Sequence, residues 1–138
     1  MAVRAVAIWG GIILAEVAHG IARVLILEPI VGDFRARQIA VFTGSAIILG
    51  IALASIRWLR PSSPREALGA GAIWLALTLT FEILFGRFVA GASWDRLWSD
   101  YNLLQGGLLP LGLLVLTMAP LGAAHWRGLW TKDARLLP

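Results

Sequence analysis

Three ionisable residues interrupt the first apolar stretch of the chain. Glu16, His19 and Arg23 lie in AEVAHGIARVL (residues 15–25), where the other residues are almost all apolar. On a helix that turns about 100° per residue, His19 lies about 60° and Arg23 about 20° from Glu16, so one face carries all three. A carboxylate and a histidine one turn apart have the spacing of a general acid and base. This face predicts a polar site and is unsuited to contact with lipid.

Glu16 and His19 also have the Glu-x2-His spacing of carboxylate-bridged metal sites in helical bundles. Those sites take the motif from two helices, whereas it occurs once here, and the nearby Arg23 repels cations. The chain has no cysteine, so it cannot form a thiolate metal site, and it has no phosphate loop or nucleophile elbow. We therefore expect neither a metal nor a cofactor.

The composition is that of an integral membrane protein. Of the 138 residues, 59% are hydrophobic and only 14% are charged, against about 25% in soluble domains. The basic residues that give the net charge of +4 stand at the ends of apolar runs, where anionic lipid headgroups are their natural partners. We therefore expect membrane lipids as partners and exclude nucleic acid.

Four apolar runs, at about 5–27, 39–56, 66–86 and 103–123, are each long enough to cross a bilayer. The first exceeds the length of the apolar region of a signal peptide and a second run follows closely, so we interpret it as a retained helix. The chain is predicted to be one all-α domain, residues 1–138, with four transmembrane helices in an up-down bundle. Small residues should bring the helices together: Ala46, Gly50 and Ala54 on the second, and Ala67 and Gly71 on the third. Pro110 should kink the fourth.

Basic residues predict the orientation in the membrane, because cytoplasmic loops carry an excess of Lys and Arg. Seven lie at the termini and in the middle loop: Arg4, Arg57, Arg60, Arg65, Arg127, Lys132 and Arg135. Four lie in the other two loops: Arg35, Arg37, Arg87 and Arg96. We expect a multi-pass protein of the bacterial inner membrane with both termini in the cytoplasm.

The loop from Gly91 to Gln105 carries the pattern of an amphipathic helix. Trp94, Leu97, Trp98 and Tyr101 recur at helical spacing after Ser93, a favourable N-cap residue. Such a helix would lie in the outer headgroup plane, either as a lid over a pocket or as an anchor only.

The polar residues gather in the half of the bilayer that faces away from the cytoplasm. Glu82, near the outer end of the third helix, is the expected ion-pair partner of Arg23, because charges within a bilayer turn inward and pair. The predicted pocket residues are Glu16, His19, Arg23, Glu82, Arg87, Asp100, Tyr101 and Asn102. The alternative is a buried ion-pair network that only fixes the register of the helices.

Residues 16–38 and 82–105 share the pattern E-x3-G followed by D-[FY]-x3-Q. If this pattern reflects a duplicated hairpin, an axis along the membrane normal relates the halves and Glu16 faces Glu82 across it. A chance match is the alternative.

Two stretches carry resemblances to known proteins. GGIILAEV (residues 10–17) resembles the first helix of small multidrug resistance transporters, four-helix proteins with an essential membrane glutamate at this place. The resemblance implies a comparable role for Glu16 alone. FEILFGRFVAGASWDRLWSDYNLL (residues 81–104) is similar to uncharacterised small bacterial four-helix membrane proteins, a resemblance that implies no activity.

Three functions are compatible with these features. The first is a pocket that binds an amphipathic or lipid-soluble small molecule and, in a stronger version, transforms it. The second is a proton-coupled small-molecule exporter that uses Glu16. The third is a structural subunit of a larger membrane complex or homo-oligomer. A polar pocket confined to one leaflet favours the first, because a carrier usually needs polar groups that can be reached from both sides.

Overall fold

A computed structural model of the chain describes residues 1–130, and within them every regular element is helical. The first half holds four helices: α1 (Ala2–Ala22), the π-helix η1 (Arg23–Leu27), α2 (Glu28–Val31) and α3 (Asp33–Leu59). The second half holds α4 (Pro64–Leu84), the π-helix η2 (Phe85–Val89), α5 (Trp94–Tyr101), the 3-10 helix η3 (Leu103–Gln105) and α6 (Leu109–Trp126).

Four helical segments are long and apolar enough to cross a membrane, as a multi-pass membrane protein requires. They are Ala2–Val31, Asp33–Leu59, Pro64–Val89 and Leu109–Trp126. The fourth begins later than the apolar run at 103, because residues 103–105 form a 3-10 turn that ends at Gly106 with φ +90°. Pro110 therefore lies in the first turn of α6, where its missing N–H costs nothing, and the expected kink at Pro110 is wrong. The proline inside α6 is Pro120.

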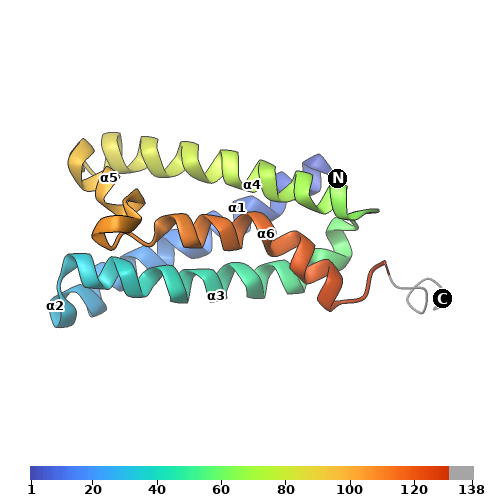
Figure 1. Ribbon diagram of the computed structural model, residues 1–138, viewed down its shortest axis with the longest axis horizontal. Helices are drawn as coiled ribbons and strands as arrows, with labels where there is room; N and C mark the ends of the chain where they lie inside the picture. Colours follow the sequence, from blue (N-terminus) through green and yellow to red (C-terminus); the bar gives the residue numbers. More distant parts are fainter. Residues whose placement is uncertain (131–138) are drawn as a thin grey trace.

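The four long helices form a ring in which α1 packs against α3 and α4, and α6 packs against the same two helices. In Figure 1, α4 lies at the top and α3 at the bottom, with α6 in front and α1 behind. A two-fold axis along the membrane normal would place α1 diagonally opposite α4 in such a ring. Because α1 and α4 are neighbours, the ring lacks the symmetry expected from the sequence repeat.

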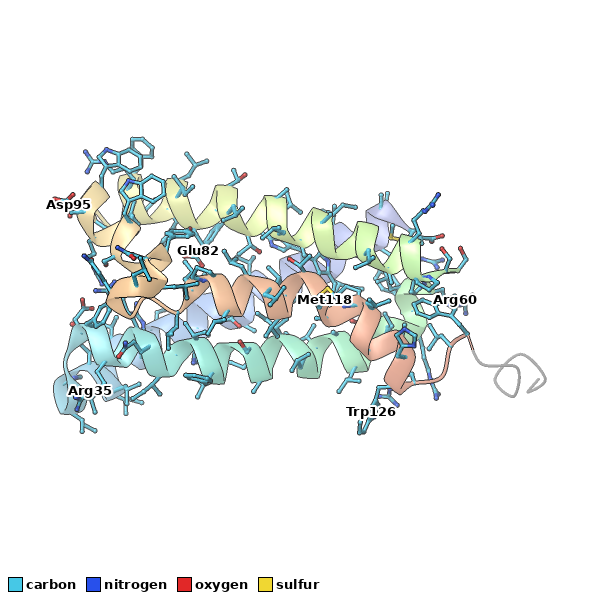
Figure 2. All side chains as sticks on the ribbon, viewed as in Figure 1. Arg35, Arg60, Glu82, Asp95, Met118 and Trp126 are labelled. Atoms are coloured by element: carbon cyan, nitrogen blue, oxygen red, sulfur yellow. The ribbon has the colours of Figure 1, made fainter. Side chains whose placement is uncertain are left out.

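The two ends of the ring differ in what they carry. The N-terminus and the end of α6 lie at one end, whereas α2 and α5 lie at the other (Figure 1). The side chains of Glu82, Asp95 and Arg35 lie toward the α2 and α5 end, and those of Arg60 and Trp126 toward the end with the N-terminus and the last turn of α6 (Figure 2). Lys132 and Arg135, which the charge count includes, lie outside the described residues.

The hydrophobic core lies in the half of the ring near the termini. Its largest buried side chains include Trp74, Ile56 and Leu59, each at most 1% exposed. Trp74 reaches across from α4 and donates its indole N–H to the carbonyl oxygen of Ala5, at 2.8 Å. This half is therefore closely packed by apolar side chains.

The prediction that small residues mediate close helix contact is correct for Gly71 on α4. On α3, the small-residue face that turns inward is a different one from the face predicted. A Cβ added to Gly71 would lie 1.9 Å from the carbonyl oxygen of Thr117, so α4 and α6 touch through their backbones. Gly50 has no neighbour within 4 Å of such a Cβ, and Ala46 and Ala54 are exposed, so this stripe does not pack within the chain. The inward face of α3 is lined instead by Gly44, Ile48, Ala52 and Ile56.

Candidate functional site

A cavity of about 630 Å³ occupies the half of the ring near α2 and α5. Most of its wall is apolar, with residues from all four long helices. Five of the eight residues predicted for the pocket line it: Glu16, His19, Arg23, Glu82 and Asp100. Five further polar residues line it as well: Arg37, Gln38, Ser45, Thr78 and Arg96. The ring is thus filled at one end and hollow at the other.

Glu16 and His19 form a short polar chain that reaches from α1 to α3. The His19 Nδ1 atom lies 3.4 Å from Glu16 Oε2, and its Nε2 atom is hydrogen-bonded to the Thr43 hydroxyl at 2.6 Å. Gly44 on α3 makes room for the carboxylate, since a Cβ there would lie 3.0 Å from Glu16 Oε2. The helix face that the sequence indicates is therefore turned toward α3 and held there by His19.

Arg23 and Glu82 both line the cavity but do not form the expected ion pair. Among residues 1–130, the pairs with N–O distances up to 4.0 Å join other residues, so this pairing is wrong as a direct contact. Arg23 is close enough to interact electrostatically with Glu82 and with Asp100. Its guanidinium faces the cavity without a carboxylate in contact.

Four buried polar atoms in this half of the ring have no hydrogen-bond partner among the described residues. They are Glu16 Oε1, Arg23 Nη1, Arg37 Nε and Tyr101 Oη. Three of these four residues line the cavity. Because a buried polar atom left unpaired costs about 1–3 kcal/mol, such a concentration is typical of a site that another molecule completes.

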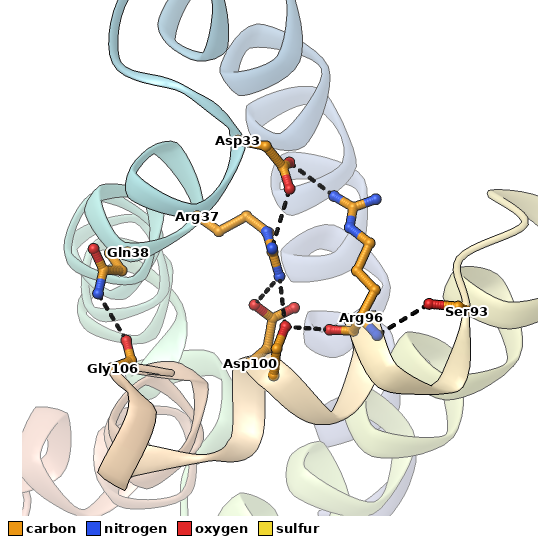
Figure 3. Close-up of polar contacts among 8 residues, drawn as sticks. Asp33, Arg37, Gln38, Ser93, Arg96, Asp100 and Gly106 are labelled. Atoms are coloured by element: carbon orange, nitrogen blue, oxygen red, sulfur yellow. Dashed lines mark hydrogen bonds and ion pairs between the residues drawn. The ribbon is translucent and has the colours of Figure 1, made fainter.

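Helix α5 closes the cavity from the end, where ion pairs hold it to α3 (Figure 3). Arg37 Nη1 lies 2.5 Å from Asp100 Oδ1, and Arg37 Nη2 lies 3.0 Å from Asp33 Oδ2. Asp33 Oδ1 also accepts from Arg96 Nη2 at 2.9 Å, so Asp33 joins the two arginines. Gly32, with φ +89°, ends α2 and lets the chain turn so that Asp33 begins α3.

Close contacts seat α5 on its neighbours. Ser93 caps it, as the sequence predicts, by accepting the N–H of Arg96. A Cβ on Gly86 would lie 2.7 Å from Leu97 Cδ2, and one on Gly107 would lie 2.2 Å from the carbonyl oxygen of Ser99. The Leu97 side chain therefore occupies the space that Gly86 leaves open, and it lines the cavity.

Three predicted pocket residues do not line the cavity. Arg87 donates to the carbonyl oxygen of Ala92 at 3.3 Å and lies over the ring of Trp94, so it shapes the chain before α5. Asn102 accepts the N–H of Leu104 with its side chain and so caps η3. Tyr101 lies against Trp98, with its hydroxyl buried and unpaired.

Burial changes the ionisation of two groups on α5. It raises the pKa of Asp100 above its usual value, although the adjacent Arg37 guanidinium opposes the shift. It also raises the pKa of Tyr101 to about 12, and the nearby carboxylates of Glu82 and Asp100 add to the effect. The tyrosine hydroxyl therefore stays protonated at physiological pH and can donate a hydrogen bond.

The site includes two features that the sequence prediction missed. The first is Arg37, which is central to the attachment of α5. Its position four residues after Asp33 could have indicated it, because that spacing suits an ion pair on one helix. The π-helices η1 and η2 both border the cavity, through Arg23 in one and Phe85 in the other. Single-turn π-helices within α-helices occur frequently at functional sites.

Within residues 1–130, no group of three or more His, Cys, Asp or Glu side chains is arranged to hold a metal ion. No protein-family model matches the chain, and neither does any curated protein or solved structure. The function must therefore be argued from the geometry of the cavity.

Proposed function

We propose that this chain is a bacterial inner-membrane protein whose cavity binds an amphipathic or lipid-soluble small molecule from the outer leaflet. In this proposal the four long helices cross the bilayer in up-down order, with both termini in the cytoplasm. Helix α5 then lies in the outer headgroup plane and covers the cavity. The excess of basic residues in the terminal segments and the middle loop of the sequence supports this orientation.

The observation that carries the proposal is a cavity lined by mostly apolar side chains and by polar atoms that lack partners. Small-molecule sites typically measure about 300–1,000 Å³, with apolar walls and a few convergent polar groups. The cavity measures about 630 Å³. Glu16 Oε1 and Arg23 Nη1 are buried and have no partner in the described part of the chain, so a ligand that bonds both removes an energetic cost.

The arrangement favours binding over a purely structural network. The ion pairs that join α5 to α3 use Asp33, Arg37, Arg96 and Asp100, which accounts for the attachment of the lid. Glu16, Arg23 and Glu82 take no part in these pairs. Their polar side chains therefore remain available for a molecule inside the cavity.

The arrangement also favours a one-sided pocket over a proton-coupled exporter. Among the described residues, the fully buried side chains near the termini are apolar, with Trp74, Ile56 and Leu59 the largest. A carrier that exposed its site to the cytoplasm would have to open this packed half, whose fully buried side chains offer no polar groups to line the path.

The test is chemical identification of what copurifies with the protein. The chain is extracted in mild detergent, and bound non-protein molecules are identified by mass spectrometry after organic extraction. We expect one amphipathic species in wild type at near-stoichiometric amount. Glu16→Gln and His19→Ala should lose it while melting stays nearly unchanged, because groups that serve a ligand contribute little to stability.

Glu28→Gln is the matched control, since Glu28 lies at the same end but does not line the cavity. It should retain the species. If wild type retains nothing, or if Glu16→Gln retains as much as Glu28→Gln, the binding proposal is wrong. A stable larger assembly whose formation depends on these residues would favour the subunit role instead.

A further inference from the structure

The charges left over in the cavity indicate the headgroup of the ligand. Resting on the proposed function, we infer that the cavity takes a zwitterionic lipid whose anionic group contacts Arg23 and whose primary ammonium contacts Glu16 and Glu82. A phosphoethanolamine headgroup has this chemistry. The apolar wall holds the acyl portion.

Arg23 supplies the anion site. Three arginines line the cavity, and two of them already contact the Asp33 carboxylate. Arg37 Nη2 lies 3.0 Å from Asp33 Oδ2, and Arg96 Nη2 lies 2.9 Å from Asp33 Oδ1. Within residues 1–130, Arg23 has no such contact, and its buried Nη1 atom has no partner. A guanidinium binds phosphate or carboxylate oxygens through two parallel N–H groups, which is the strongest pairing open to it.

The two glutamates supply the ammonium site. Glu16 and Glu82 lie close enough to interact electrostatically, and neither is within 4.0 Å of an Lys or Arg nitrogen among residues 1–130. Glu16 Oε1 has no hydrogen-bond partner among residues 1–130. Both carboxylates line the cavity, and a primary ammonium offers three N–H donors with which to bond them there and reduce their mutual repulsion. A quaternary ammonium has no N–H to offer.

The apolar residues that line the cavity favour a whole lipid as the ligand over a free, water-soluble headgroup. Three large apolar residues that line the cavity from α1 and η1 are also exposed: Ile21, Val24 and Leu25. On a membrane-spanning helix such side chains face the acyl chains. The cavity therefore borders the outer leaflet directly, and a lipid can keep its tail among its neighbours while its headgroup reaches Arg23.

The inference is tested by lipid competition. Wild-type protein is reconstituted in nanodiscs that contain equal amounts of phosphatidylethanolamine, phosphatidylcholine and phosphatidylglycerol with identical acyl chains. Lipids retained after transfer to detergent are counted by native mass spectrometry. Phosphatidylethanolamine should be retained about tenfold or more over each of the other two lipids. Neither the choline nor the glycerol headgroup has a primary ammonium that can donate hydrogen bonds to Glu16 and Glu82.

Substitutions show which residues are responsible for the preference for phosphatidylethanolamine. Arg23→Met and Glu82→Gln should abolish it, whereas Arg35→Met and Glu28→Gln, changes of the same type at the same end but outside the cavity, should keep it. Loss of the preference in the two control variants would overturn the assignment. Because the comparison of three lipids uses wild type, it decides the headgroup even where a variant does not fold.

The outcomes separate the two proposals. Equal retention of the three lipids, all lost in Glu16→Gln, overturns the headgroup inference and leaves the binding pocket standing. Retention of none of the three lipids overturns the headgroup inference, and the binding proposal then stands or falls on the copurified species of the preceding test. Glycerophosphoethanolamine, the same headgroup without acyl chains, should not displace the lipid at equal concentration, and displacement would overturn the assignment to a lipid.

Discussion

Gly44 sets how closely the Glu16 carboxylate can approach helix α3. An alanine Cβ at this position would lie 3.0 Å from Oε2, 3.4 Å from Oε1 and 3.5 Å from His19 Cε1. The Gly44→Ala variant should therefore push the carboxylate and imidazole aside and lower ligand retention. Stability should change little, because the gain of about 0.5–1 kcal/mol from replacing a helical glycine offsets the crowding. Melting temperature and bound ligand are measured on the same sample.

Gly50→Ala is the matched control on the same helix, since its Cβ would meet nothing within 4 Å. It should raise the melting temperature slightly and leave ligand retention at the wild-type level. Equal retention in the two variants would show that Glu16 does not contact the ligand.

Tyr101 provides a readout of the environment under α5, because it is the sole tyrosine of the chain. Burial and the nearby carboxylates raise its pKa from 10.0 to about 12. Ultraviolet titration of the native protein should accordingly show phenolate forming near pH 12. A midpoint near 10 would mean that the ring lies in water.

The raised pKa of Tyr101 also predicts how the stability of the protein changes with pH. Between pH 10 and about 12 the unfolded chain has lost the tyrosine proton and the native state still holds it. Stability must therefore fall as pH rises through this range, since the native state binds more protons. Tyr101→Phe should show a smaller fall, which thermal melting across the range measures.

At the scale of elements, helix α5 owes its position to a small number of ion pairs. Asp33 contacts Arg96 on α5 and also contacts Arg37 on its own helix, which in turn pairs with Asp100 on α5. Asp33→Asn therefore weakens one direct link between α3 and α5 and removes a contact that orients Arg37 in the other. We expect faster amide hydrogen exchange in residues 94–101, with exchange in the long helices unchanged, because local opening follows the stability of the element that opens.

Asp95→Asn serves as the control for that experiment. Asp95 lies in the first turn of α5, is exposed and does not line the cavity. Its exchange pattern should match wild type. Equal acceleration in the two variants would indicate that α5 responds to lost negative charge in general and is not held by Asp33.

The sequence predicted some elements and not others, for physical reasons. Apolar runs of membrane-spanning length identified the four long helices, and Ser93 marked the start of α5. The sequence did not show which face of α3 turns inward. Apolar residues occur on every side of this helix, and both Gly44 and Gly50 fit a small-residue contact. The start of α6 at Leu109 also escaped, although Gly106 and Pro110 mark a break and a helix start, because Leu103, Leu104 and Leu108 extend the apolar run across the break.

The polar site was predicted in part. A face of α1 with Glu16, His19 and Arg23 follows from helical geometry alone, and these residues do line one cavity. That Arg23 contacts no carboxylate among the described residues could not be derived in this way, because the ion pairs at this end depend on how α5 folds back over the ring. Arg37, and not Arg23, contacts the α5 carboxylate Asp100.

At the scale of the whole molecule, the asymmetry between a packed end and a hollow end implies an orientation that labelling can test. The chain lacks cysteine, so single cysteines can be introduced without background. In intact cells, a membrane-impermeant maleimide should label Asp95→Cys and spare Ser62→Cys, since these exposed sites lie at opposite ends. The reverse pattern would move the cavity to the cytoplasmic leaflet.

The central claim is that the cavity around Glu16 and Arg23 holds a ligand. The most direct measurement is a crystal structure of the wild-type protein grown from a lipidic phase. The account predicts elongated non-protein density in the cavity, with its polar end within hydrogen-bonding distance of Glu16 Oε1 and Arg23 Nη1 and its apolar end leaving past Leu25. A cavity closed by side chains, with Arg23 in direct contact with Glu82, would contradict it.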